Sequence, residues 1–257
     1  AALMLTACTT PDDVQPPSAA HGSVSSPASD AAASSGPGNV EEPQTGELAG
    51  RVIVLDPGHQ LGNARFSAQV NRPVDVGNGT KACNTSGTQS NAGLAEATFN
   101  WKVAELMREQ LQALGARVVM TRESNSADAW GPCVDVRGRA GNAIGADLKV
   151  SIHADGTHAA GAQGFHVITP PAHIVGERLA KRSWRLARQI RAGLREEGFE
   201  PANYVAAGTG VQHRSDLATL NLSRVPVVLA ELGNMRSTHD AEQMSSRQGR
   251  AAYVRGL

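Results

Sequence analysis

The sequence predicts an α/β domain in which helices are layered on a largely parallel central sheet. Short apolar runs of strand length alternate with longer segments of helical apolar periodicity, an order typical of parallel sheets with crossover helices. No internal repeat is visible. Roughly 200 residues follow Gly50, which is enough chain for one domain with a full core.

Five apolar runs are expected to form strands of this sheet. The first ends at Pro57-Gly58, a dipeptide that marks a tight turn, and the fourth is stopped by Pro170-Pro171. Their length and apolar content indicate buried strands. The expected strands are 51–56, 116–121, 148–153, 164–169 and 225–232.

Helical periodicity appears between these runs. The segment from Ala95 repeats apolar residues at helical spacing and ends at Gly115, where a glycine commonly terminates a helix. The segment 177–197 has one apolar side fit for the core and is closed by Gly198. A short helix or turn is expected over 136–146, and one amphipathic helix over 240–257.

One long segment, 61–93, follows neither pattern. It is mostly polar and rich in Gly, Asn, Ser and Thr, so we expect a loop with little order of its own. A loop of this length is uncommon in a compact domain and is usually functional. It contains Cys83.

The N-terminal residues indicate export. Residues 1–8 have the form of the end of a signal peptide that leaves Cys8 at the new N-terminus, similar to the bacterial lipoprotein signature; the alternative is an ordinary signal peptide with a chance cysteine. Residues 9–49 are expected to form a disordered linker, because too few large apolar side chains are present to offset the entropy of ordering. Residues 50–257 then form the folded domain.

With Cys8 assigned to a lipid, two cysteines remain. Cys83 and Cys133 are an even pair in an exported protein, where disulfides persist, so a bridge between them is expected. Two free thiols are the alternative. A metal site at these cysteines is disfavoured because no CxxC or Cys-His spacing is present.

The charge balance argues against two classes of partner. The formal net charge is zero, so no global field attracts nucleic acid or an anionic membrane. No apolar segment approaches the ~20 residues of a membrane-spanning helix.

Polar residues stand at the ends of three expected strands. His59 follows the first strand, His153 ends the third, and Glu231 lies near the end of the last. The carboxyl ends of parallel strands meet at one ligand crevice, which Glu96 can also approach from the first turn of its helix. Two His and two Glu suit a catalytic zinc with three protein ligands and a separate general base. Spacing alone leaves open which Glu is the ligand, and a histidine considered singly is more often structural.

These residues lie in motifs that resemble a known family. Val54-Leu-Asp-Pro-Gly-His59, Ser151-Ile-His-Ala154 and Pro226-Val-Val-Leu-Ala-Glu-Leu-Gly233 occur in this order, with Glu96, Thr121-Arg122 and Arg137 between them. Together they resemble the zinc-dependent N-acetylmuramoyl-L-alanine amidase family of the amidase-3 type, from Arg51 to the C-terminus.

The resemblance implies a fold and a set of roles. The fold is a single layered domain with a central, mostly parallel sheet of about six strands flanked by helices. His59, Glu96 and His153 are implied as ligands of one zinc ion, with Glu231 as the general base. The implied reaction is hydrolysis of the amide between N-acetylmuramic acid and L-alanine by a zinc-activated water, in remodelling or autolysis of the cell wall. Asp56 is expected to serve the turn or to support a ligand by a hydrogen bond, rather than to bind the metal itself.

Some residues depart from the family pattern. Gln60 replaces a second glycine, the 61–93 loop is much longer than the usual link, and Asp155 adds a carboxylate near the site. The histidines expected to be structural or on the surface are His158, His166, His173, His213 and His239, although His213 and Arg214 could reach substrate.

Other functions stay open at this point. One is a catalytically inactive peptidoglycan-binding module, and another is a different zinc peptidase of the cell wall. We expect an exported monomer of the periplasm or cell wall, anchored to the membrane if Cys8 carries a lipid, acting on peptidoglycan or a released muropeptide and not on nucleic acid.

Overall fold

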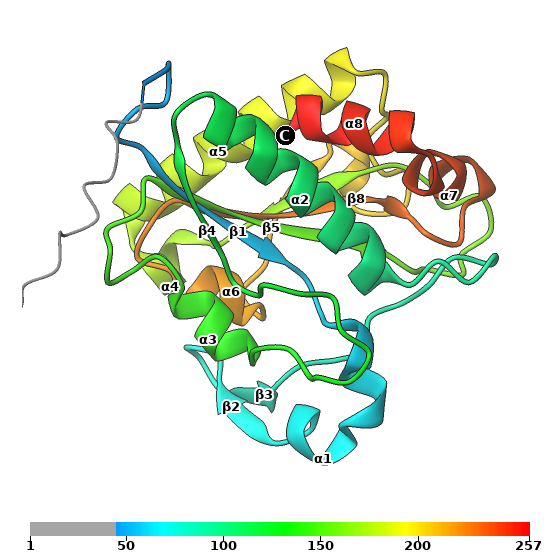
Figure 1. Ribbon diagram of the computed structural model, residues 1–257, viewed down its shortest axis with the longest axis horizontal. Coiled ribbons are helices and arrows are strands. Elements are labelled where there is room, and N and C mark those ends of the chain that lie inside the picture. The colour runs from blue at the N-terminus through cyan, green and yellow to red at the C-terminus, as the bar shows by residue number, and fades with distance from the viewer. Residues whose placement is uncertain (1–44) are drawn as a thin grey trace, which may run out of the picture. The chain divides into compact units, whose positions relative to one another are not determined.

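The computed structural model describes residues 45–257. They form a six-stranded sheet with helices on both faces, which confirms the predicted α/β class (Figure 1). Cys8, the expected signal-peptide remnant and most of the expected linker lie outside the described residues.

The sheet is mixed, and its strand order is β4-β1-β5-β8-β6-β7. Only the pair of β6 with β8 is antiparallel; the other four pairs of neighbouring strands are parallel. All five expected strands are present, and β7 is the one that the sequence did not indicate, because three residues show no period. The strands are β1 (Val52–Pro57), β4 (Arg117–Met120), β5 (Leu148–Asp155), β6 (His166–Thr169), β7 (Val211–His213) and β8 (Val227–Asn234).

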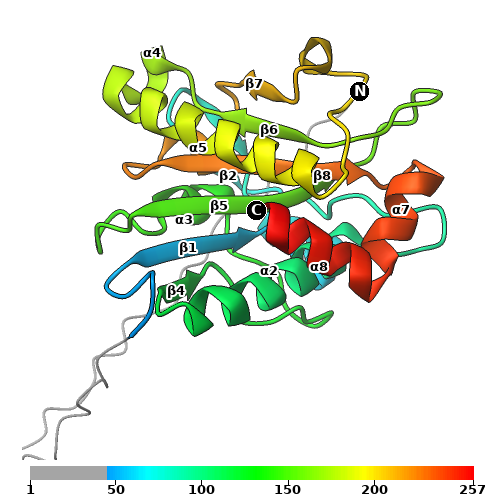
Figure 2. The same ribbon diagram turned by 90° about the horizontal axis from the view of Figure 1, so that it is seen from above.

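Helices cover the two faces unequally (Figures 1 and 2). One face carries α2 (Glu96–Ala113), α5 (Glu177–Glu196), α7 (Thr238–Ser245) and α8 (Arg247–Gly256). The larger core lies there, and the ring of Tyr253 contacts those of Phe99 and Phe199. The other face carries the short helices α3 (Val134–Arg139) and α6 (Ala218–Asn221), and α4 (Ala172–Val175) precedes α5. Residues of α3 and α6 line a cleft on this face.

The last helix and the last strand differ from their expected bounds. The single helix expected over 240–257 is broken at Ser246, which has an extended backbone and caps α8 by accepting a hydrogen bond from the N–H of Gly249. The last strand begins at Val227 rather than Val225, and the proline between them has no N–H to donate to the sheet.

The 61–93 segment is more ordered than expected. It contains a 3-10 helix (Leu61–Arg65), α1 (Ser67–Val70) and a hairpin of β2 (Pro73–Asp75) and β3 (Thr80–Ala82). A disulfide joins Cys83 to Cys133, and Asn84 Nδ2 donates to the carbonyl of Pro132 at 2.8 Å. The order therefore comes from contacts with distant parts of the chain, which a local reading of composition does not detect.

The fold also begins earlier than the expected boundary at Gly50. The N–H of Leu48 donates to the carbonyl of Leu114 at 2.8 Å, and the Leu48 side chain packs against the main core. Residues 46–49 therefore belong to the domain rather than to a linker.

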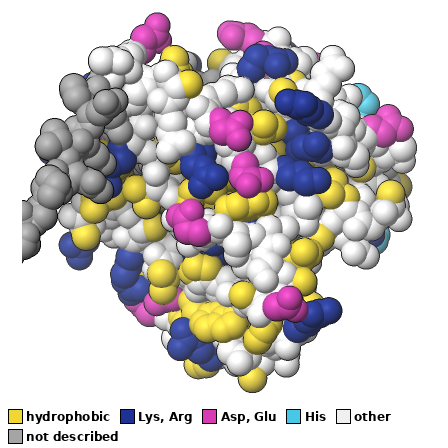
Figure 3. Space-filling view, viewed as in Figure 1, with side chains coloured by type: hydrophobic (Ala, Val, Ile, Leu, Met, Phe, Trp, Pro, Cys, Tyr) yellow, Lys and Arg dark blue, Asp and Glu magenta, His cyan; other side chains and the backbone are white. Residues whose placement is uncertain are grey.

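On the face shown in Figure 3, basic, acidic and apolar side chains are interspersed, in keeping with the formal net charge of zero. Within residues 45–257, every helix is too short or too polar to cross a bilayer.

Candidate active site

Three of the predicted site residues meet at the carboxyl edge of the sheet. His59 follows β1, His153 lies near the end of β5, and Glu96 is the first residue of α2. Oε1 of Glu96 lies 3.2 Å from Nε2 of His59 and 3.0 Å from Nδ1 of His153. One candidate ligand atom from each residue lies within 4.8 Å of the other two. Two imidazole nitrogens and a carboxylate oxygen are a recurrent ligand set of catalytic zinc.

His59 is oriented by the 61–93 segment. Its Nδ1 lies 3.0 Å from the carbonyl of Thr85, which fixes the proton on Nδ1 and leaves Nε2 free to face Glu96. His59 also has a φ of 60°, a left-handed conformation that costs free energy for a residue with a Cβ and is concentrated at functional sites.

Glu96 is held as a carboxylate. Its Oε2 accepts a hydrogen bond from the N–H of Thr88 at 3.0 Å, and its Oε1 accepts one from Asn100 at 3.3 Å. Burial opposes ionisation of Glu96, but His59 and His153 outweigh it and lower the pKa of this carboxyl well below its usual value. An ionised carboxylate is the form that binds a metal.

Two glycines, Gly58 and Gly87, leave room for the side chains of His153 and Glu96. A Cβ built on Gly58 would lie 2.2 Å from a ring carbon of His153. One built on Gly87 would lie 2.7 Å from Oε2 of Glu96, and Gly87 has a φ of 75°. Neither position accommodates a side chain while these residues stay in place. Nothing in the sequence alone marks Gly87 as a site residue.

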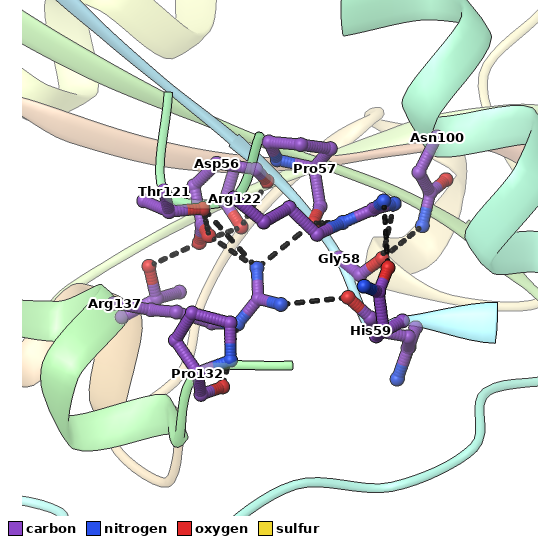
Figure 4. A network of polar contacts seen from close by, with 12 residues as sticks. Asp56, Pro57, Gly58, His59, Asn100, Thr121, Arg122, Pro132 and Arg137 are labelled. Atoms are coloured by element: carbon purple, nitrogen blue, oxygen red, sulfur yellow. Dashed lines mark hydrogen bonds and ion pairs between the residues drawn. The ribbon is translucent and has the colours of Figure 1, made fainter. Parts of the chain in front are cut away.

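Two buried arginines hold the 57–59 turn by its carbonyls (Figure 4). Nη2 of Arg137 donates to the carbonyl of His59 at 2.6 Å, and its Nη1 forms an ion pair with Asp56 at 2.7 Å. Nε of Arg122 donates to the first carbonyl of the turn at 2.9 Å. Asp56 thus serves the turn, as expected.

The buried carboxylate of Asp56 has further partners. Burial opposes its ionisation, but Arg137, Lys149 and the hydroxyls of Thr121 and Ser151 lower its pKa far below the usual value of 3.8. Hydroxyls 2.7 to 2.9 Å from the carboxylate oxygens belong to Thr121, Ser151 and Thr219. Because the pKa is lower in the folded state, this stabilisation is fully present above pH 3.8 and is lost as the pH falls below it.

Replacing Arg137 by Met is expected to lower the free energy of unfolding by about 3–5 kcal/mol, because it leaves the buried Asp56 carboxylate without its ion-pair partner. Urea denaturation at neutral pH measures this. Arg139→Met is the matched control: Arg139 lies in the same helix, pairs with Asp75 and Asp135, and its side chain is 49% exposed, so a change below about 1 kcal/mol is expected. Equal effects of the two substitutions would contradict this account.

Glu231 stands beside the three-residue cluster without belonging to it. It lies opposite His153 in the pairing of β5 with β8. Its Oε2 is buried and has no hydrogen-bond partner in the described part of the chain. Burial, together with the charges of Glu96 and Asp155, raises the pKa of Glu231 well above its usual value. The site therefore contains two glutamates whose pKa values are shifted in opposite directions, a pattern that separates acid–base roles.

A cleft of ≈ 360 Å³ opens at the two histidines. Residues of the 81–85 segment line one part of it, and residues 216–219 around α6 line another. Lys81 Nζ and Asp216 Oδ2 join these two walls by an ion pair of 2.8 Å. The 61–93 segment therefore forms one wall of the cleft at the site.

Removing the disulfide with Cys83→Ser/Cys133→Ser is expected to destabilise the protein by about 4 kcal/mol, because the bridge closes a loop of 50 residues. Cys83 lies two residues before Thr85, so activity on muropeptide and on intact wall should fall as well. Thermal unfolding and both assays test this, with the dithiothreitol-treated wild type as a second route to the open form. Unchanged stability and unchanged activities would show that the bridge has no such role.

The fold and the His-Glu-His cluster define an α/β protein with a candidate metal site at the carboxyl edge of its sheet. Residues 53–257 match the model of the amidase-3 family, described as N-acetylmuramoyl-L-alanine amidase. The chain belongs to this family.

Individual relatives are similar in sequence and in fold. An N-acetylmuramoyl-L-alanine amidase of Mycobacterium tuberculosis is 41% identical over 213 residues, which are 82% of this chain and 84% of the relative. The apo form of the N-acetylmuramyl-L-alanine amidase from Mycobacterium abscessus matches with a TM-score of 0.73 and 44% identity over 81% of this chain and 95% of its own. The corresponding enzyme from Mycobacterium smegmatis gives a TM-score of 0.74 and 38% identity over the same shares.

Proposed function

We propose that this protein hydrolyses the amide bond between N-acetylmuramic acid and L-alanine in peptidoglycan, with zinc as its metal and Glu231 as general base. The observation that carries the proposal is the His59–Glu96–His153 cluster at the mouth of a cleft, with a second glutamate beside it. Membership of the amidase-3 family and the names of the relatives support the choice of bond.

The residues present fit a zinc ion. Nε2 of His59, Oε1 of Glu96 and Nδ1 of His153 would hold it, since these atoms already converge and His59 is oriented by Thr85. A bound zinc ion polarises the scissile carbonyl and lowers the pKa of water towards ~7.

Glu231 moves the proton. It takes the proton of the attacking water and delivers it to the leaving amine of L-alanine, which completes cleavage of the C–N bond. A raised pKa suits this role, because the carboxyl must both accept and release a proton near neutral pH. Its separation from the three-residue cluster supports the choice of Glu96, rather than Glu231, as the ligand.

The protein is exported to the periplasm or cell wall, as action on peptidoglycan requires, and Cys8 carries a lipid that anchors it to the membrane. The catalytic domain acts as a monomer on polymeric wall or on released muropeptide.

Incubation with a defined muropeptide, N-acetylmuramoyl-L-alanyl-D-isoglutamine, tests the bond that is cut. Mass analysis should show free N-acetylmuramic acid and a dipeptide with a new L-alanine N-terminus. An inactive binding module would retain the muropeptide without products. Another wall peptidase would leave the lactyl–alanine bond intact and release amino acids from the C-terminal end of a longer stem.

A further inference from the structure

A second histidine lies next to Glu231. In the antiparallel pairing of β6 with β8, His166 is directly opposite Glu231, and His153 is opposite Glu231 on the other side, in β5. Residues directly opposite each other in neighbouring strands project from the same face of a sheet. His153, Glu231 and His166 therefore form a polar row across three strands, and this face also carries the cleft.

The facing side chains each contain an atom without a partner. His166 is 3% exposed, and its Nδ1 is buried with no hydrogen-bond partner among residues 45–257. Oε2 of Glu231 is also buried and also has no hydrogen-bond partner among these residues. A buried polar atom without a partner is costly, and these two are complementary, since an imidazole N–H donates and a carboxylate oxygen accepts.

The ring of Tyr204 holds the imidazole of His166 in place. The ring of Tyr204 packs edge-on against that of His166, with centroids 6.2 Å apart, and its hydroxyl donates to Oδ2 of Asp155 at 3.1 Å. Burial lowers the pKa of His166 to about 4, so the ring is neutral when the wall is hydrolysed. A neutral donor orients a carboxylate without suppressing its basicity as strongly as a cation would.

We propose that His166 is a positioning residue for Glu231. Neither atom has a partner among residues 45–257, so the Nδ1–H of His166 donates to Oε2 of Glu231 through one water molecule and leaves the other carboxylate oxygen to take the proton. This inference rests on the proposed function, in which Glu231 is the general base. It predicts an effect on turnover rather than on substrate affinity or metal binding.

Three substitutions of His166 distinguish a hydrogen-bonding role towards Glu231 from a role in packing alone. His166→Ala removes the donor; His166→Asn places an amide N–H where Nδ1 stands; and His166→Gln places it nearer Nε2. His173→Ala is the control, since His173 is exposed in α4. Each variant is assayed for kcat and KM on the soluble muropeptide, for zinc per chain, and for thermal unfolding.

We expect His166→Ala to lower kcat about 10- to 100-fold, the range for loss of a hydrogen bond to a charged group, with KM changed less than about twofold and zinc unchanged. His166→Asn should recover most of kcat, His166→Gln less, and His173→Ala should match the wild type.

The inference is overturned if the Ala variant turns over like the wild type, if only KM changes, if zinc is lost, or if Asn is no better than Gln. Should His166→Ala fold poorly, the folded Asn and Gln variants still decide, because the hydrogen bond predicts their order. A wild type that releases no L-alanyl peptide would instead contradict the proposed function itself.

Discussion

Glu231→Gln is expected to lower kcat by about 10²- to 10⁴-fold, the usual contribution of a general base, while zinc stays near one per chain. Glutamine has nearly the same size but cannot accept the proton of the attacking water. Steady-state kinetics on the muropeptide and metal analysis of the same preparation measure the two quantities.

The surface variant Glu123→Gln is the control for this experiment, because its side chain is 74% exposed and it should keep full activity. Loss of zinc from Glu231→Gln would mean that Glu231 and Glu96 exchange roles. Full activity of the variant would remove Glu231 from the mechanism.

Replacing any one of His59, Glu96 or His153 by Ala is expected to lower zinc content and activity together. Each of these residues supplies one of the three converging donor atoms, so two ligands remain, too few for a stable catalytic site. Metal analysis after dialysis and the muropeptide assay should therefore fall in parallel, to well below one zinc per chain and to background hydrolysis. A Glu96→Ala variant that retains a full complement of zinc would sink this assignment.

Much of the fold could be predicted because it depends on local signals. The strands β1, β5 and β8 are apolar runs bounded by turn residues, and α2 and α5 carry a periodic apolar side. The break at Ser246 was missed because no proline or glycine stands at it, and the hydrogen bond from the N–H of Gly249 to the Ser246 side chain is not visible in apolar periodicity. The order of the 61–93 segment was missed because it depends on a disulfide and on hydrogen bonds to residues far along the chain.

The site residues likewise divide into those that the sequence could indicate and those that only the folded structure brings together. His59, His153 and Glu231 could be singled out because they stand at strand ends, and the family motifs assigned their expected roles. Thr85 and Gly87 could not, because their contacts with His59 exist only once the long segment has folded back over the site. His166 was grouped with structural histidines because the antiparallel pairing that places it opposite Glu231 is a property of the sheet order, which the sequence does not state.

The most direct measurement is digestion of purified peptidoglycan by the full chain, with a chelator, without it, and after zinc is restored to the chelated protein. The account predicts free stem peptides that begin with L-alanine and glycan strands that remain uncut, with release abolished by the chelator and recovered with zinc. Release that is indifferent to the chelator, or cleavage at any other bond, would contradict it.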